Sequence, residues 1–202
     1  MSRLLKLALG TAITVASATL ATAQTTTSET PSEATQAPSA AGLKAWEGIH
    51  EVFSHPRCAN CHTPDERPRW SGPHYKAKFK NHAMNVQRGE DGMGNTGLRC
   101  STCHGETNSA KLHGPPGAPH WATAPIEMKW FAQSSKAICE QVKDPARNGD
   151  KTLEEVAVHV RDDKLVGWGW APGPGREPAP GSAQATYELL QTWIAEGAPC
   201  PG

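Results

Sequence analysis

Apolar positions in this chain recur at helical spacing near both ends of its main body. Over residues 41–54 they predict an amphipathic helix, which leads directly into Cys58. From about Ala183 to Glu196 they predict a second such helix, closed by Gly197. Both ends of the main body are therefore expected to be helical.

Between these helices the pattern predicts two shorter ones. Thr152 and Glu155 have the spacing of a capping box, which opens a helix running to about Arg161. Residues 135–143 are expected to form the other helix. The remaining sequence is dense in glycine and proline, which predicts irregular loops and little strand. The expected fold class is mostly α with long Gly/Pro-rich loops.

Residues 1–23 have the pattern of a signal peptide. An apolar run from Leu7 to about Ala16 follows two basic residues, and Ala21-Thr22-Ala23 has the small-x-small form of a cleavage site. This predicts a periplasmic protein that is processed after about Ala23. The apolar run is too short to cross a bilayer, so no stable membrane insertion is expected after processing.

The composition divides the rest of the chain into a leader and a domain. Residues 24–42 are rich in Thr, Ser, Glu, Pro and Ala, which predicts a disordered leader, and residues 43–202 are long enough for one compact domain. The formal net charge is zero, but residues 43–111 hold ten Lys and Arg against seven Asp and Glu, whereas residues 140–202 hold six against ten. Such a mild bias does not favour a nucleic-acid partner.

The motif C-x-x-C-H occurs twice, as Cys58-Ala-Asn-Cys61-His62 and as Cys100-Ser-Thr-Cys103-His104. On one helical turn, two cysteines at this spacing can both form thioethers with the vinyl groups of one porphyrin. The histidine that follows then supplies the proximal iron ligand. The repeat predicts two covalently bound haem c groups, with the four cysteines as attachment points and His62 and His104 on the irons.

A thioredoxin-like redox pair or a zinc ribbon would also use C-x-x-C. The redox motif belongs to a βαβ setting, which is not visible around either cysteine pair. Zinc ribbons separate their pairs by about 15–20 residues, and the segment 62–99 between Cys61 and Cys100 is much longer than that. Neither alternative explains the two trailing histidines, so haem is the favoured interpretation.

Cys58 and Cys100 lie too close together in the sequence for two cytochrome domains in tandem. One integrated dihaem cytochrome c domain, with its haems near each other, is expected instead. Cys139 and Cys200 remain outside the motifs, and in an oxidising compartment they predict one disulfide. Two unrelated buried thiols are the alternative.

The sixth iron ligands are predicted from similar offsets along the chain. His82, which follows His62, is assigned to the first haem, and Met128, which follows His104, is assigned to the second. A surface histidine and a packing methionine are the alternatives. Mixed ligation would give the two haems distinct potentials. The other candidates are His74, Met84, Met93, His113 and His120.

Some conspicuous residues have simpler interpretations. His159 lies beside Val156 and Val160, where a packing or surface histidine is favoured over a ligand. Trp168 and Trp170 are expected to pack against haem or to anchor a loop, with a docking patch as the alternative. The basic residues that could neutralise haem propionates, steer an acidic partner or form a solvated surface are Arg67, Arg69, Lys76, Lys78 and Lys80.

Three longer motifs accompany the haem signature, namely HAMNVQRG at residues 82–89, HGPPGAP at residues 113–119 and WGWAPG at residues 168–173. With the haem motifs they resemble exported dihaem cytochrome c proteins labelled as an isoquinoline 1-oxidoreductase subunit, over about residues 44–201. The resemblance implies electron transfer from a periplasmic molybdenum hydroxylase to the respiratory chain. It does not extend to the hydroxylase itself, because the sequence shows no molybdopterin or iron–sulfur module.

The expected function is electron transfer between redox proteins, with a periplasmic dehydrogenase as donor and a cytochrome or oxidase as acceptor. A dihaem enzyme of the peroxidase or thiosulfate-oxidising type is the alternative. Such an enzyme needs one open haem with an acid–base group nearby, and no carboxylate is placed to take that role. A redox or gas sensor is a third class, for which the sequence shows no output domain.

Overall fold

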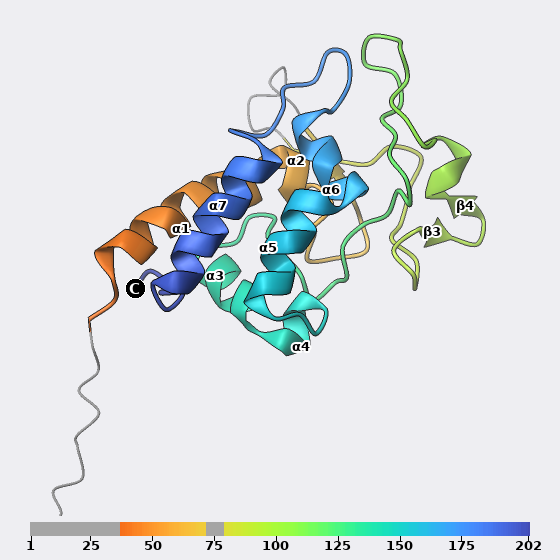
Figure 1. The fold of residues 1–202 in the computed structure, drawn as a ribbon. Coiled ribbons are helices and arrows are strands. Elements are labelled where there is room, and N and C mark those ends of the chain that lie inside the picture. Colours follow the sequence, from red (N-terminus) through yellow and green to blue (C-terminus); the bar gives the residue numbers. More distant parts are fainter. Residues whose placement is uncertain (1–36, 72–78) are drawn as a thin grey trace, which may run out of the picture. The chain divides into compact units, whose positions relative to one another are not determined.

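Residues 37–71 and 79–202 are described by the structure, a computed structural model of the chain (Figure 1). The predicted signal peptide and the leader up to residue 36 lie outside the described residues, as do His74, Lys76 and Lys78. The described residues belong to the compact unit Ala37–Gly202.

The described part is mostly helical, with two short β-ribbons. Its helices are α1 (Ala40–Phe53), α2 (Pro56–Ala59), α3 (Ser135–Lys143), α4 (Pro145–Asn148), α5 (Leu153–Asp162), α6 (Lys164–Gly167) and α7 (Ala183–Ala195), with 3-10 turns η2 (Cys100–Thr102) and η3 (Trp168–Trp170). The strands pair antiparallel, β1 (Arg69–Trp70) with β2 (Lys80–Asn81) and β3 (Gly94–Asn95) with β4 (Leu98–Arg99). Long loops join these elements, as the density of glycine and proline predicts.

The apolar core lies among the longer helices. Helices α1 and α7 pack against each other, and α5 packs against α7, so the three lie side by side (Figure 1). Their buried faces carry large side chains because apolar residues recur at helical spacing. The largest side chains that are fully buried include Trp46, Ile49, Phe53, Ile138, Val142, Leu190 and Trp193.

Helix α1 begins slightly earlier than the predicted start of the domain. The Ser39 side chain accepts a hydrogen bond from the backbone N–H of Gly42, at 3.2 Å, and thereby caps the helix at Ala40. Gly42 also lies against Pro199, where a Cβ atom would come within 2.6 Å of the proline ring. The first turn of α1 is therefore part of the folded unit, whereas the composition of residues 24–42 predicts leader.

The other predicted helices occur where the sequence places them. In the capping box of α5, the Thr152 hydroxyl accepts from the backbone N–H of Glu155 at 3.2 Å, and the Glu155 carboxylate accepts from the N–H of Thr152 at 2.8 Å. Helix α3 spans the predicted residues, and α7 ends one residue before the predicted end.

The predicted disulfide is confirmed, since Cys139 on α3 is bonded to Cys200 near the C-terminus. Two hydrogen bonds hold the same terminal segment, from the Trp193 indole to the carbonyl of Pro199 at 2.9 Å and from the Lys143 ammonium to the carbonyl of Ala198 at 2.7 Å. The terminal residues are thus fixed to the helical core. Among the described residues, none of the helices has the length and apolarity needed to cross a bilayer.

Candidate functional site

The first C-x-x-C-H motif begins on α2 and continues through one further turn. His55 caps this helix, with its Nδ1 accepting from the N–H of Arg57 at 3.2 Å, and Pro56 occupies the first turn, where its missing N–H costs nothing. The backbone N–H groups of Cys61 and His62 both point to the carbonyl of Cys58, at 3.2 and 3.3 Å. Both cysteines and the histidine therefore lie on one turn.

The second motif has the same local fold, although it starts on the 3-10 turn η2. The N–H groups of Cys103 and His104 point to the carbonyl of Cys100, at 3.2 and 3.0 Å. Two segments of different surroundings thus adopt one backbone arrangement. It is the arrangement in which two thiols and an imidazole can reach a single porphyrin.

The imidazole of His62 is held on two sides. Its Nδ1 lies 2.8 Å from the carbonyl oxygen of Met128, and its ring stacks on Trp130 with centroids 3.6 Å apart and planes 3° from parallel. A carbonyl only accepts, so Nδ1 carries the proton and Nε2 keeps its lone pair. Burial lowers the pKa of His62 to about 4, so the ring is neutral at physiological pH.

His104 repeats this arrangement with different partners. Its Nδ1 lies 2.8 Å from the carbonyl oxygen of Pro116, and its ring stacks on Trp121 with centroids 4.6 Å apart and planes 4° from parallel. Burial again lowers the pKa of this histidine. An imidazole whose Nδ1–H is fixed by a carbonyl has its Nε2 oriented for a metal, a support that metal-bound histidines commonly have.

All four motif cysteines are free thiols in the structure. Burial raises the pKa of Cys58 to about 12 and that of Cys61 to about 11, and it also raises the pKa of Cys100. These three groups are therefore protonated thiols at neutral pH. They are not thiolates of the kind found in reactive redox pairs.

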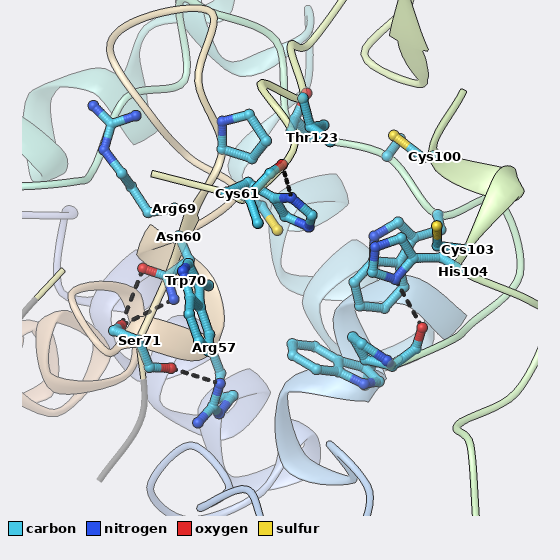
Figure 2. Close-up of a pocket in the computed structure, with 18 of the residues that line it drawn as sticks. Arg57, Asn60, Cys61, Arg69, Trp70, Ser71, Cys100, Cys103, His104 and Thr123 are labelled. Atoms are coloured by element: carbon cyan, nitrogen blue, oxygen red, sulfur yellow. Dashed lines mark hydrogen bonds between the residues drawn. The ribbon is translucent and has the colours of Figure 1, made fainter. Parts of the chain in front are cut away.

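Two cavities open beside the two motifs. The first pocket, of about 350 Å³, is lined by Cys58, Cys61 and His62, and the second pocket, of about 510 Å³, is lined by Cys100, Cys103 and His104. Both volumes lie in the range of about 300–1,000 Å³ that is typical of ligand and cofactor sites. Figure 2 shows the second pocket, with Cys103 and His104 on one side and Cys61 opposite.

The two pockets adjoin, because one set of residues lines both of them. Within this shared wall, the rings of Trp121 and Trp168 meet edge to face with centroids 5.0 Å apart. Trp121 is also the residue stacked on His104. The residues of the shared wall are Arg57, Cys61, Trp121, Ala122, Thr123 and Trp168.

The structure reverses the pairing of the distal-ligand candidates with the two motifs. His82 lines the second pocket, where its ring centroid lies 6.0 Å from that of His104, and Met128 lines the first pocket. The offset-based assignment of His82 to the first haem and Met128 to the second is therefore not supported. Among the other candidates, Met84 and His113 line the second pocket.

The position of His82 relative to His104 fits two ligands of one iron. Metal–imidazole bonds are about 2 Å long, so two imidazoles on one metal ion have ring centres about 6 Å apart. The Nδ1 of His82 lies 3.1 Å from the carbonyl oxygen of Ala83, which leaves Nε2 available. His82 directly follows β2, whose pairing with β1 thus helps to bring a second imidazole to the second pocket.

Three arginines that the sequence analysis did not select line the second pocket, and of these Arg99 is paired with Asp91, whereas Arg57 and Arg176 are not paired with a carboxylate of the described residues. Arg57 donates to the carbonyls of Glu177 and Ser71, at 2.7 and 3.2 Å, and Arg176 donates to the carbonyl of Gly114. Neither forms a salt bridge with another described residue, and burial, together with the charge of Arg176, lowers the pKa of Arg57. Two such cations suit an anionic ligand such as a haem propionate.

Of the basic stretch singled out in the sequence, Arg69 also lines the second pocket, but it is paired with a carboxylate. Arg69 forms a salt bridge with Asp65, at 2.6 Å, and its guanidinium lies over the ring of Phe131. Of Arg57 and Arg176, only Arg57 could have been selected from the sequence, because it directly precedes Cys58. Arg176 lies far beyond His104 in the chain, and no sequence pattern links it to the motif.

The tryptophans of the W-G-W turn anchor loops and line the pockets. The Trp168 indole donates to the side chain of Asn108, and the Trp170 indole donates to the carbonyl of Pro180, both at 2.9 Å. Trp168 belongs to the shared wall, and Trp170 lines the first pocket. Their predicted role in anchoring a loop is supported.

The chain was also compared with known proteins. No family model, curated protein or solved structure matches it. Within residues 37–71 and 79–202, no group of three His, Cys, Asp or Glu side chains is arranged to hold a bare metal ion.

Proposed function

We propose that this protein is a periplasmic dihaem c-type cytochrome that transfers electrons. In this proposal Cys58 and Cys61 attach the first haem, and Cys100 and Cys103 attach the second. His62 and His104 are the proximal ligands. The donor is a periplasmic dehydrogenase of the molybdenum hydroxylase type, and the acceptor is a cytochrome or oxidase on the way to the respiratory chain.

The observation that carries the proposal is the repetition of one geometry at the two motifs. At each motif, a histidine directs Nδ1–H to a backbone carbonyl and stacks on a parallel tryptophan. Each motif histidine also lines a cavity, His62 the first pocket and His104 the second. The partners come from different loops, so the repetition does not follow from the five-residue motif alone.

Haem, when bound, supplies an iron that gains and loses one electron at a time. The residues of this chain hold it, keep water away and set the charge around it. The lining of both pockets combines apolar and aromatic side chains with charged ones, and in the second pocket Arg57 and Arg176 offer positive charge to the propionates. The 6.0 Å between the ring centroids of His82 and His104 supports His82 as the second ligand of that iron.

The shared wall supports passage of electrons between the two haems. Trp121, which stacks on the proximal His104, and Trp168 touch within this wall, and Trp168 also lines the first pocket. Two haems in adjoining pockets form a relay, in which one exchanges electrons with the donor and the other with the acceptor.

The proposal is tested by producing the full chain in a host with cytochrome c maturation machinery and measuring its intact mass. The expected mass is that of the processed chain plus two haems, with a low-spin haem spectrum. The variant Cys100→Ala with Cys103→Ala is expected to carry one haem, and Cys139→Ala with Cys200→Ala, which removes two cysteines outside the motifs, is expected to keep both. A bare chain would refute the proposal.

The same preparation separates a carrier from the dihaem enzyme. Both reduced haems of a carrier are expected to be six-coordinate and inert to carbon monoxide. Rapid carbon monoxide binding together with turnover of peroxide or thiosulfate would favour the enzyme instead.

A further inference from the structure

Helix α5 turns a single face toward the first pocket. The residues that it contributes to the lining are Val156, His159 and Val160, and Asp163 follows at the end of the helix. Their spacing of three, four and seven positions is that of one helix face. His159 is thus a nitrogen donor inside the pocket that Cys58 and Cys61 line.

The position of His159 on α5 is fixed by its surroundings. Val156 and Val160, which flank it on the same helix face, are buried, and α5 packs against α7. The side chain of His159 is 44 % exposed, which leaves its ring accessible at the pocket instead of enclosed in the core. His62 and His159 both line the first pocket.

Asp163 lies behind one of the two ring nitrogens of His159. Its Oδ2 atom faces Nδ1 at 3.6 Å, too far for a hydrogen bond but close enough for the carboxylate charge to favour a proton on Nδ1, with Nε2 left as the donor atom. The other oxygen of Asp163 accepts from the N–H groups of Leu165 and Val166, at 2.8 and 3.0 Å, and so holds the carboxylate in place. A carboxylate behind an imidazole is a common support of metal-bound histidines.

The backbone of Met128, the competing donor in this pocket, lies on the Nδ1 side of His62. Its carbonyl oxygen contacts Nδ1 of His62, the nitrogen that points away from the position of the iron. Its methyl group lies against Gly149 at the end of α4, where a Cβ atom would come within 2.8 Å of it. A porphyrin on the Nε2 side of His62 would separate Met128 from the sixth coordination position.

We propose that His159 is the sixth ligand of the first haem, with Nε2 directed to the iron and Asp163 as the positioning residue behind Nδ1. The inference rests on the proposed dihaem function and completes it. Because His82 faces His104 in the second pocket, both haems then have two histidine ligands. The mixed His/Met ligation expected from the sequence is replaced by bis-histidine ligation.

The test uses the full chain matured with haem and the variant His159→Ala. Intact mass is expected to show two haems in both proteins. In the variant, half of the haem is expected to become high-spin and to bind carbon monoxide, whereas the parent protein binds none. Added imidazole is expected to restore the low-spin spectrum. The matched control is His50→Ala, a helical histidine that lines neither pocket and whose loss is expected to change no spectrum.

The outcomes separate the inference from the function on which it rests. A parent protein without covalent haem refutes the dihaem function. Two haems that stay low-spin and inert in His159→Ala overturn the ligand assignment alone, as does opening of one haem by Met128→Leu but not by His159→Ala. If His159→Ala does not accumulate, His159→Met, which retains a ligand, is expected to raise the potential of one haem, and unchanged potentials overturn the assignment.

Discussion

The two C-x-x-C-H sites share one geometry but belong to different parts of the molecule. At the first site, Phe53 of α1 stacks on Trp130 with centroids 4.3 Å apart, and Trp130 stacks on His62, which joins the motif to the helical core. At the second site, His104 stacks on Trp121 of a loop. The first site is an extension of the core, whereas the second is built by loops.

The second site is also less buried than the first. At the first site, burial raises the pKa of Cys58 to about 12 and lowers that of His62 to about 4. At the second site Cys103 is exposed, and so are Trp70 and Met84 on the rim of its pocket. The first motif is thus enclosed by the helical core, and the second is open to solvent; under the proposed function, the second haem would be the one that a redox partner can approach.

Removing haem attachment from one site at a time is expected to give the largest difference between the sites, in helix content and in yield. Cys58→Ala with Cys61→Ala leaves a cavity between α1 and α5, so this variant is expected to lose most of its helical structure and its yield. Cys100→Ala with Cys103→Ala is expected to keep its helices and one haem. Far-ultraviolet circular dichroism and intact mass measure both effects, and equal helix content in the two variants would contradict the comparison.

The disulfide should stabilise the helical part by a smaller amount. Cys139→Ala with Cys200→Ala removes a link across 61 residues and is expected to lower the free energy of unfolding by about 2–4 kcal/mol. Both haems should stay attached, because neither cysteine lines a pocket. Urea unfolding of the haem-loaded proteins measures the change, with the reduced parent protein as the control. A difference below about 1 kcal/mol would show that the terminal segment is held by other contacts.

The two stacked tryptophans allow a matched comparison. Trp130→Leu removes stacking on Phe53 and His62 and leaves the buried Gln141 side chain without its indole donor, so a loss of about 2–3 kcal/mol is expected. Trp121→Leu, in the loop, is expected to cost about 1 kcal/mol. Urea unfolding followed by haem absorbance measures both, and a larger loss for Trp121→Leu would contradict the assignment of the first site to the core.

The longer helices could be predicted from the sequence because their signals are local. The apolar spacing of residues 41–54 indicates α1, and the capping pair Thr152 and Glu155 indicates the start of α5. Each signal lies within a short stretch of the chain. Helices α2, α4 and α6 are too short for a period to be visible. The disulfide could be predicted because only two cysteines remained after the motifs were counted.

The partners of the motif histidines could not be predicted, because loops bring them together over distances that no local pattern encodes. The offsets from His62 to His82 and from His104 to Met128 are similar, yet the loops carry each residue to the other motif's pocket. His159 was set aside because it lies beside two valines that suggest a packing position. His159 becomes a ligand candidate only because it lines the first pocket, which is formed by segments far apart in the sequence.

The smallest expected effect comes from removing the negative charge of Asp163 from the lining of the first pocket. Asp163→Asn keeps the cap of α6, since asparagine caps helices as well as aspartate does, but it removes a negative charge from the first pocket. That charge favours ferric over ferrous iron, so its loss is expected to raise the potential of the first haem by about 30 mV, or about 0.7 kcal/mol for one electron. Asp162→Asn is the control, because Asp162 is paired with Arg161 at 2.7 Å and lines neither pocket. Redox titration should show one of two midpoints moving in the first variant and none in the control; equal shifts in both variants would mean that Asp163 acts only through the overall charge of the surface.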